Sequence, residues 1–83
     1  MSLDELAEMV RHDLASVLGI DPSEITDDTS FDDLEVDSID IVEVIGVAER
    51  KLSIEIQEQR FNQIRRFSEL VAIIKEKVDA KVS

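Results

Sequence analysis

Apolar residues recur along the first eighteen positions with the spacing of one helix face. They lie three or four positions apart, at Leu3, Leu6, Ala7, Val10, Leu14, Val17 and Leu18. This spacing predicts an amphipathic helix over residues 2–18. Ser2 and Glu5 have the spacing of a capping box at its start, and Gly19 is a typical stop.

Turn-forming and polar residues then replace the helical period. Residues 19–36 contain the only Pro and a cluster of Asp, Ser and Thr, which favour turns and bonds from side chains to the backbone. Ile20, Ile25, Phe31 and Leu34 give this stretch apolar anchors. We therefore expect a long loop that packs across the helices rather than an idle connection.

A second helix begins within the sequence "LEVDSID". Asp37 is a good N-cap, and Asp40 falls in the first turn, where a carboxylate suits the helix dipole. Val36 and Ile41 have the spacing of a hydrophobic staple. These start signals predict Ser38 as the first helical residue.

This second helix is expected to run to about residue 52. The residues that can face inward are Ile39, Val42, Ile45, Ala48 and Leu52. Gly46 lies in its middle, at a cost near 1 kcal/mol relative to Ala. We interpret this glycine as a sign of close approach or of free space.

The remaining pattern is a short extended piece, one or two helical turns that carry Phe61 and Ile64, and a last helix over residues 67–80. The apolar face of the last helix holds Phe67, Leu70, Val71, Ile74 and Val78. The tail, residues 79–83, is expected to fray. The sequence thus predicts an all-α fold, a small four-helix bundle of three main helices and one short helix, in a single domain over residues 1–83.

Composition narrows the chemistry that this domain can perform. A chain of 83 residues is too small for a deep enzymatic cleft. It has no Cys, Trp or Tyr, which excludes thiol chemistry and disulfides, and its only histidine is His12. His12 lies off the apolar stripe, so we interpret it as an exposed helix residue rather than a ligand or base. No metal site is expected, because the acidic loop lacks the register of a calcium-binding loop.

Charge is divided unequally along the chain, whose net charge is −11. The segment 1–49 holds fifteen acidic residues and one basic residue, whereas 50–83 holds five acidic and eight basic residues. The acidic half repels phosphate backbones, so nucleic acid is not an expected partner, and basic protein surfaces are. No apolar run is long enough for a membrane span, and the acidic N-terminus does not resemble a signal peptide, so a cytoplasmic protein is expected.

Ser38 is the residue whose chemistry needs an explanation. It lacks the flanking glycines of a nucleophile elbow, and His12 is the only histidine, so a self-contained serine hydrolase is not expected. Glu35, Asp37 and Asp40 oppose a phosphate arriving from solution. An anion installed covalently by another enzyme would instead use the N–H groups of the helix. The alternative is an acidic interaction module in which this serine only begins a helix.

With "FDDL" before it and "IEI" after it, the stretch "VDSIDIVE" resembles the acyl carrier proteins over almost the whole chain. In this family the serine of an Asp-Ser-Leu motif bears a 4′-phosphopantetheine arm. The resemblance implies that Ser38 is the attachment residue and that Asp37, Ile39 and Asp40 are its motif neighbours.

The resemblance also implies a carrier with no catalytic activity of its own, free-standing and monomeric. Its partners would be a phosphopantetheinyl transferase (holo-acyl-carrier-protein synthase) and the synthases, reductases, dehydratases or acyltransferases that use the acyl carrier. These enzymes belong to fatty acid or related lipid biosynthesis. A carrier of aminoacyl or polyketide intermediates is the alternative within the class.

Two sets of residues follow from the resemblance. The acidic residues expected to recognise partner enzymes are Glu35, Asp40, Glu43 and Glu49. The candidates for an acyl pocket that opens between the helices are Val42, Ile45, Gly46, Phe61, Ile64 and Phe67.

The chain departs from the family pattern in its second half and just before the motif. Glu35 stands where the family often has Gly. Arg65 and Arg66 replace the hydroxyl residues often found before the last helix, so its usual N-cap is missing and two cations lie near the wrong end of the dipole. With Arg50 and its neighbours, these cations are either variation on an exposed surface or a face that selects other partners.

Overall fold

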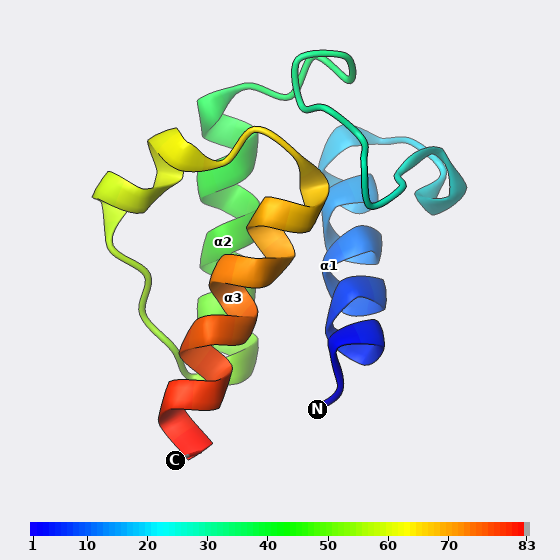
Figure 1. Cartoon of the computed structure of the whole chain (residues 1–83). Helices are drawn as coiled ribbons and strands as arrows, with labels where there is room; N and C mark the ends of the chain where they lie inside the picture. The colour runs from blue at the N-terminus through cyan, green and yellow to red at the C-terminus, as the bar shows by residue number, and fades with distance from the viewer. Residues whose placement is uncertain (83) are drawn as a thin grey trace.

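The computed structural model describes residues 1–82, and helices joined by loops make up its regular structure (Figure 1). The elements in chain order are α1 (Leu3–Leu18), the 3₁₀ helix η1 (Pro22–Glu24), α2 (Ser38–Leu52), the 3₁₀ helix η2 (Glu58–Gln63) and α3 (Phe67–Val82). The predicted four-helix arrangement is confirmed, with η2 as the short helix. The sequence did not predict η1.

α1 begins and ends as its sequence signals predicted. Ser2 and Glu5 form the expected capping box, and Gly19 adopts a left-handed conformation with φ +70° as its N–H donates to the Ala15 carbonyl. α3 continues two residues beyond the expected end at residue 80. The tail over residues 79–83 was expected to fray, but residues 79–82 belong to α3, and Ser83 lies outside the described residues.

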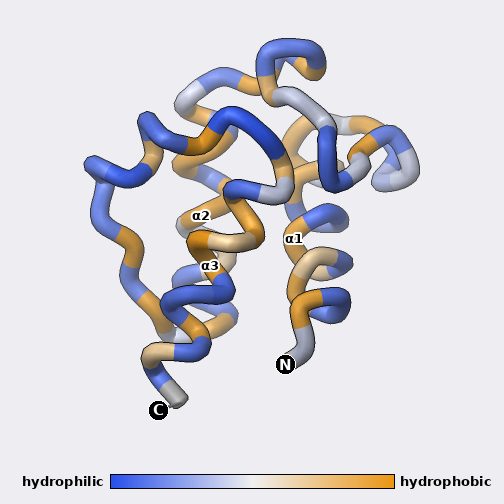
Figure 2. The backbone as a smooth tube through the Cα atoms, in the orientation of Figure 1, coloured by the Kyte–Doolittle hydropathy of each residue, from blue (hydrophilic) through white to orange (hydrophobic). Residues whose placement is uncertain are grey.

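The apolar faces of the three α-helices meet in one core, where the hydrophobic segments of the chain face one another (Figure 2). The largest fully buried side chains are Phe67, Leu6, Leu14, Ile45, Leu70, Ile74, Val10 and Val44. The long loop contributes Ile25 and Phe31, both buried, and Ile20 and Leu34 pack partly against the core. The loop is therefore part of the fold, as its apolar anchors predicted.

The buried face of α2 differs from the expected one. Ile39 and Val42 are 73 % and 51 % exposed, whereas the expectation placed both inward. The residues of α2 that are buried are Ile41, Val44, Ile45 and Ala48. Apolar residues are nearly continuous from Ile39 to Ala48, so the spacing fitted two adjacent faces and could not choose between them.

The start of α3 is capped by the long loop together with Glu69 of its own first turn. The N–H groups of Phe67 and Ser68 each donate to a loop carbonyl, those of Thr29 and Asp27, at 3.0 Å. The Glu69 carboxylate accepts from the backbone N–H of Arg66 at 2.8 Å. The free N–H groups at a helix start must find acceptors, and here they find them across the fold. The missing cap expected at Arg66 is thus replaced.

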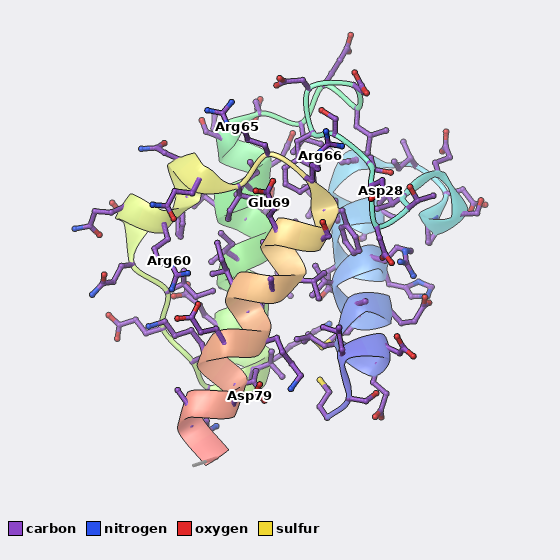
Figure 3. The ribbon with its side chains drawn as sticks, in the orientation of Figure 1. Asp28, Arg60, Arg65, Arg66, Glu69 and Asp79 are labelled. Carbon is purple, nitrogen blue, oxygen red and sulfur yellow. The ribbon has the colours of Figure 1, made fainter. Side chains whose placement is uncertain are left out.

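The Arg66 side chain also bonds the long loop at this junction (Figure 3). Its guanidinium donates to the Asp28 carbonyl at 3.0 Å. The Arg65 carbonyl accepts from the Phe31 N–H at 2.9 Å, and the Phe31 carbonyl accepts from Val36 at 2.9 Å. These bonds connect the start of α3 to the segment that leads into α2.

We expect Gly46→Ala to stabilise the protein by about 0.5–1 kcal/mol, because glycine within a helix costs that much relative to alanine. A Cβ at this position would lie 3.5 Å from Arg50 Nη1, which is an ordinary contact with a flexible side chain. Urea unfolding followed by circular dichroism measures the change. Gly19→Ala is the matched control and should destabilise the protein, since its φ of +70° disfavours a Cβ. A destabilised Gly46→Ala protein would contradict this reading of Gly46 as open space.

Candidate functional site

Ser38 is the first residue of α2, at the end of the bundle where the long loop arrives (Figure 1). Asp37 is the N-cap, and its carboxylate accepts from the Asp40 N–H at 2.9 Å. The Asp40 carboxylate accepts from the Asp37 N–H at 3.3 Å, which completes a capping box. The predicted start of α2 is therefore confirmed, and both aspartates fix the conformation of the backbone around Ser38.

The Ser38 side chain is exposed and makes no hydrogen bond with any described residue. The first N–H groups of a helix have no acceptor within it, and the helix dipole adds positive potential there. Only the third of them, that of Asp40, is taken by the cap. A phosphodiester on the Ser38 oxygen would therefore meet N–H donors at this end of α2, so the site fits a covalently attached phosphate group.

A surface hollow of about 440 Å³ opens beside Ser38 between α2 and η2. Its α2 side is formed by Ser38, Ile41 and Val42. Its η2 side is formed by Glu58, Gln59, Phe61 and Asn62. One wall is therefore mainly apolar and the other mainly polar.

The six candidates for an acyl pocket fall into three groups. Val42 and Phe61 line the hollow beside Ser38. Ile45, Ile64 and Phe67 are buried in the core, at no more than 5 % exposure. Gly46 lies beside the side chain of Arg50, one turn further along α2. The structure thus does not bring the six together in one cavity.

Sequence reasoning missed the polar wall of the hollow. Gln59 and Asn62 carry no motif, and they reach the neighbourhood of Ser38 only because η2 packs against α2. Ile41, which lines the hollow and is 9 % exposed, was assigned only to the staple.

The acidic residues expected to recognise partners differ in what their carboxylates do. Glu43 is exposed on α2, and Glu35 is exposed in the loop just before it. Asp40 is half-buried and takes part in the capping box. The Glu49 carboxylate accepts from the Ile56 N–H at 3.0 Å, so it also holds the segment after α2 in place.

We expect Glu35→Gly to stabilise the protein by about 0.5–1 kcal/mol, because Glu35 has a φ of +57° and a side chain disfavours that conformation. Thermal unfolding followed by circular dichroism measures the change. Glu35→Gln is the matched control, since it removes the same charge and keeps the Cβ. Equal midpoints for the two variants would mean that charge, and not backbone conformation, is responsible.

Most of the unusual cations at positions 50–66 have partners inside the molecule. Lys51 bonds the Asp13 carboxylate at 2.9 Å, and Arg60 bonds the Glu76 carboxylate at 2.8 Å. The hydrogen bond from Arg60 holds the pKa of Glu76 below its ordinary value. Together with Arg66, which bonds the long loop, these side chains serve the fold, and this explains part of the basic character of the second half.

Comparison with known proteins decides between the carrier and the interaction module. A family profile described as a phosphopantetheine attachment site matches residues 4–74. The chain belongs to the acyl carrier protein family. The acyl carrier protein of Chlamydia caviae is 37 % identical over 71 residues, which cover 84 % of this chain and 92 % of that one. The acyl carrier protein of Guillardia theta is 36 % identical over 81 residues, covering 96 % of this chain and all of that one.

A solved structure shows the same fold. The crystal structure of the acyl carrier protein from Thermotoga maritima superposes with a TM-score of 0.85 and 21 % sequence identity, covering 98 % of this chain and 95 % of that one. As an acyl carrier protein, this chain bears a covalently attached 4′-phosphopantetheine.

His12, its only histidine, has a 65 % exposed side chain, as expected. Within residues 1–82, no helix has the length and apolar character to span a membrane.

Proposed function

We propose that Ser38 is the residue to which 4′-phosphopantetheine is attached, and that the protein delivers acyl groups on this arm to partner enzymes. The observation that supports it best is an exposed serine hydroxyl at the N-terminus of a capped helix, with no hydrogen-bond partner among the described residues. The group supplies a terminal thiol on which an acyl cargo is held as a thioester. Asp37 and Asp40 hold the helix start in the conformation that presents the hydroxyl.

The chain itself contributes binding and presentation rather than catalysis. The N–H groups at the start of α2 would stabilise the negative charge of a phosphodiester attached to Ser38. The acidic surroundings then favour loading by an enzyme with a basic surface over capture of a free anion. We infer that the chemistry of acyl transfer is carried out by the partner enzymes.

The exposed face of α2 fits the docking of those enzymes. Ile39 and Val42 expose apolar surface beside Ser38, and Glu43 adds negative charge next to them. A basic enzyme surface with a small apolar contact complements this face, and a modest interface allows release after each transfer. The partners proposed are a phosphopantetheinyl transferase and the synthases, reductases, dehydratases or acyltransferases of fatty acid or related lipid biosynthesis. We infer a monomer that works in the cytoplasm.

Loading of the apo protein tests the proposal. The full chain is incubated with coenzyme A, magnesium and a phosphopantetheinyl transferase, and the intact mass is measured. We expect the mass to rise by one phosphopantetheinyl group, and peptide mapping to place that group on Ser38. Absence of an adduct with transferases of differing selectivity would contradict the proposal.

A further inference from the structure

A second surface hollow, the α1–α3 groove, lies between the first turns of α1 and the start of α3. Leu3 and Ala7 line it from α1, Val71 lines it from α3, and Asp27 lines it from the long loop. The groove shares no lining residue with the hollow beside Ser38. α1 and η2 also lie on opposite sides of α3 (Figure 1). The two hollows are therefore separate surfaces.

Exposed apolar surface accompanies the α1–α3 groove. Among the side chains that the structure describes, the large apolar ones that are exposed fall into two pairs, Ile39 with Val42 on α2 and Met1 with Leu3 at the start of α1. The pair on α2 belongs to the docking face proposed above. Leu3 is 54 % exposed at the edge of the groove, whereas Val71 is 4 % exposed. An apolar side chain placed in the groove would remove Leu3 from water, which is favourable.

The charged residues of the α1–α3 groove are mainly acidic. Asp4, Glu8 and Asp27 contribute three carboxylates, and Arg11 is the only basic residue of the lining. Arg11 bonds both Glu8 and Asp27, so one positive charge stands against three negative charges. Arg66, at the start of α3, is not part of the lining. The groove therefore complements a basic partner and repels an acidic one.

The α1–α3 groove is fixed by bonds between the elements that form it. The Asp27 carboxylate accepts from the Arg11 guanidinium at 3.3 Å, and the Asp27 carbonyl accepts from the Ser68 N–H at 3.0 Å. Docking on such a surface costs little ordering. Its volume of about 270 Å³ lies below the range of about 300–1,000 Å³ that is typical of small-molecule sites. The groove therefore fits a side chain of a partner protein better than a free small molecule.

We propose that the α1–α3 groove docks a basic amphipathic segment of a partner protein and leaves Ser38 free for a second partner. An apolar side chain of that segment would contact Leu3, while its Lys or Arg residues would lie near Asp4 and Glu8. Docking in the groove does not depend on attachment of the arm at Ser38. Only the simultaneous loading of Ser38 rests on the proposed function.

A peptide titration tests the docking. The probe is a synthetic peptide of leucine and lysine with the period of an amphipathic helix, added to the apo protein. We expect the methyl signals of Leu3, Ala7 and Val71 to shift and to saturate. The apparent Kd should rise with ionic strength, because salt screens exposed charges. A peptide with glutamate in place of lysine should leave these signals unchanged.

The chain offers a closely matched control for the contact residue. Leu3→Glu and Ile39→Glu add the same charge at an exposed apolar residue in the first turn of a helix, but only Leu3 lines the groove. We expect Leu3→Glu to weaken binding about five- to tenfold, measured on the Ala7 and Val71 signals, because the apolar contact is lost. Ile39→Glu should not weaken it. Asp4→Asn should weaken it at low salt only.

Loading of Ser38 tests whether two partners can bind at once. The apo protein is loaded by a phosphopantetheinyl transferase with and without saturating leucine–lysine peptide. We expect the peptide to affect the wild-type and Leu3→Glu proteins equally, because an occupied groove does not cover Ser38. A larger loss of loading in the wild-type protein would contradict simultaneous binding. If Ser38 is not loaded even without peptide, the proposed function has failed, and the titration still decides the docking.

Three results would overturn the docking itself. The first is a shift of the Ile39 and Val42 signals alone, since the peptide would then bind only the face of α2. The second is a shift of the groove signals with increasing protein concentration and no peptide, which would identify a second copy of the chain as the occupant. The third is a shift of the groove signals on acylation of the arm, which would assign the groove to the cargo.

Discussion

The Ser38→Ala protein should remain unmodified when the wild-type protein is fully converted to the phosphopantetheinyl form. The substitution removes the oxygen that would form the phosphodiester, so the expected loss of loading is complete rather than partial. The hydroxyl makes no hydrogen bond with the described residues, and the cap of α2 comes from Asp37. The free energy of unfolding should therefore change by no more than about 0.5 kcal/mol.

Ser68→Ala is the matched control for this experiment. Ser68 is also an exposed serine in the first turn of a helix, but it lies at the start of α3. The Ser68→Ala protein should still fold and be loaded on Ser38 at the wild-type rate. An adduct on the Ser38→Ala protein would place the attachment at another residue. Equal loss of loading in both variants would point to a general defect in recognition by the transferase.

Phe67→Ala is expected to destabilise the protein by about 3–5 kcal/mol, the usual cost of truncating a fully buried aromatic side chain. Phe67 is 0 % exposed, and the guanidinium carbon of Arg11 lies 5.2 Å from its ring centroid. The substitution leaves a cavity at the start of α3 and removes this cation–π contact. A small domain has only about 5–15 kcal/mol of stability, so the midpoint of urea unfolding should fall steeply. Urea unfolding followed by far-ultraviolet circular dichroism suits a chain without Trp or Tyr.

Phe61→Ala is the matched control, because it distinguishes the effect of burial on stability from the effect of losing an aromatic ring. Phe61 is half-buried at the edge of the hollow, and its truncation opens that hollow instead of creating an enclosed cavity. Its cost should be less than half of that of Phe67→Ala. Equal costs for the two variants would contradict the assignment of Phe67 to the centre of the core.

The parts of the fold that the sequence predicted are those with local causes. The start of α2 depends on Asp37 and Asp40, which are three positions apart, and a capping box needs nothing else. Gly19 ends α1 for an equally local reason, its left-handed conformation. Such signals are complete within one helical turn, so they can be read without knowledge of the rest of the fold.

The features that the sequence did not predict depend on contacts between distant segments. The orientation of α2 is decided by what packs against Ile41 and Val44, and a nearly continuous apolar run does not encode that choice. The polar wall beside Ser38 exists because η2 lies next to α2. No local sequence pattern predicts that contact. Gln59 could therefore be assigned to the site only from the structure.

The interaction-module alternative is excluded by membership of the acyl carrier protein family, but the choice of cargo is not decided by it. Part of the basic character of the second half serves the fold, since Lys51, Arg60 and Arg66 bond within the molecule.

The capping of α3 by loop carbonyls has a consequence for how this chain tolerates change. Every residue type offers a backbone carbonyl, so the identities of the side chains at Asp27 and Thr29 matter little to the cap. The number of residues between Asp27 and Thr29, and between Thr29 and Ser38, matters much more than their identities. One inserted or deleted residue would move both acceptors out of register with α3 and shift the approach to α2. The constraint falls on chain length, which a scan of single substitutions would not detect.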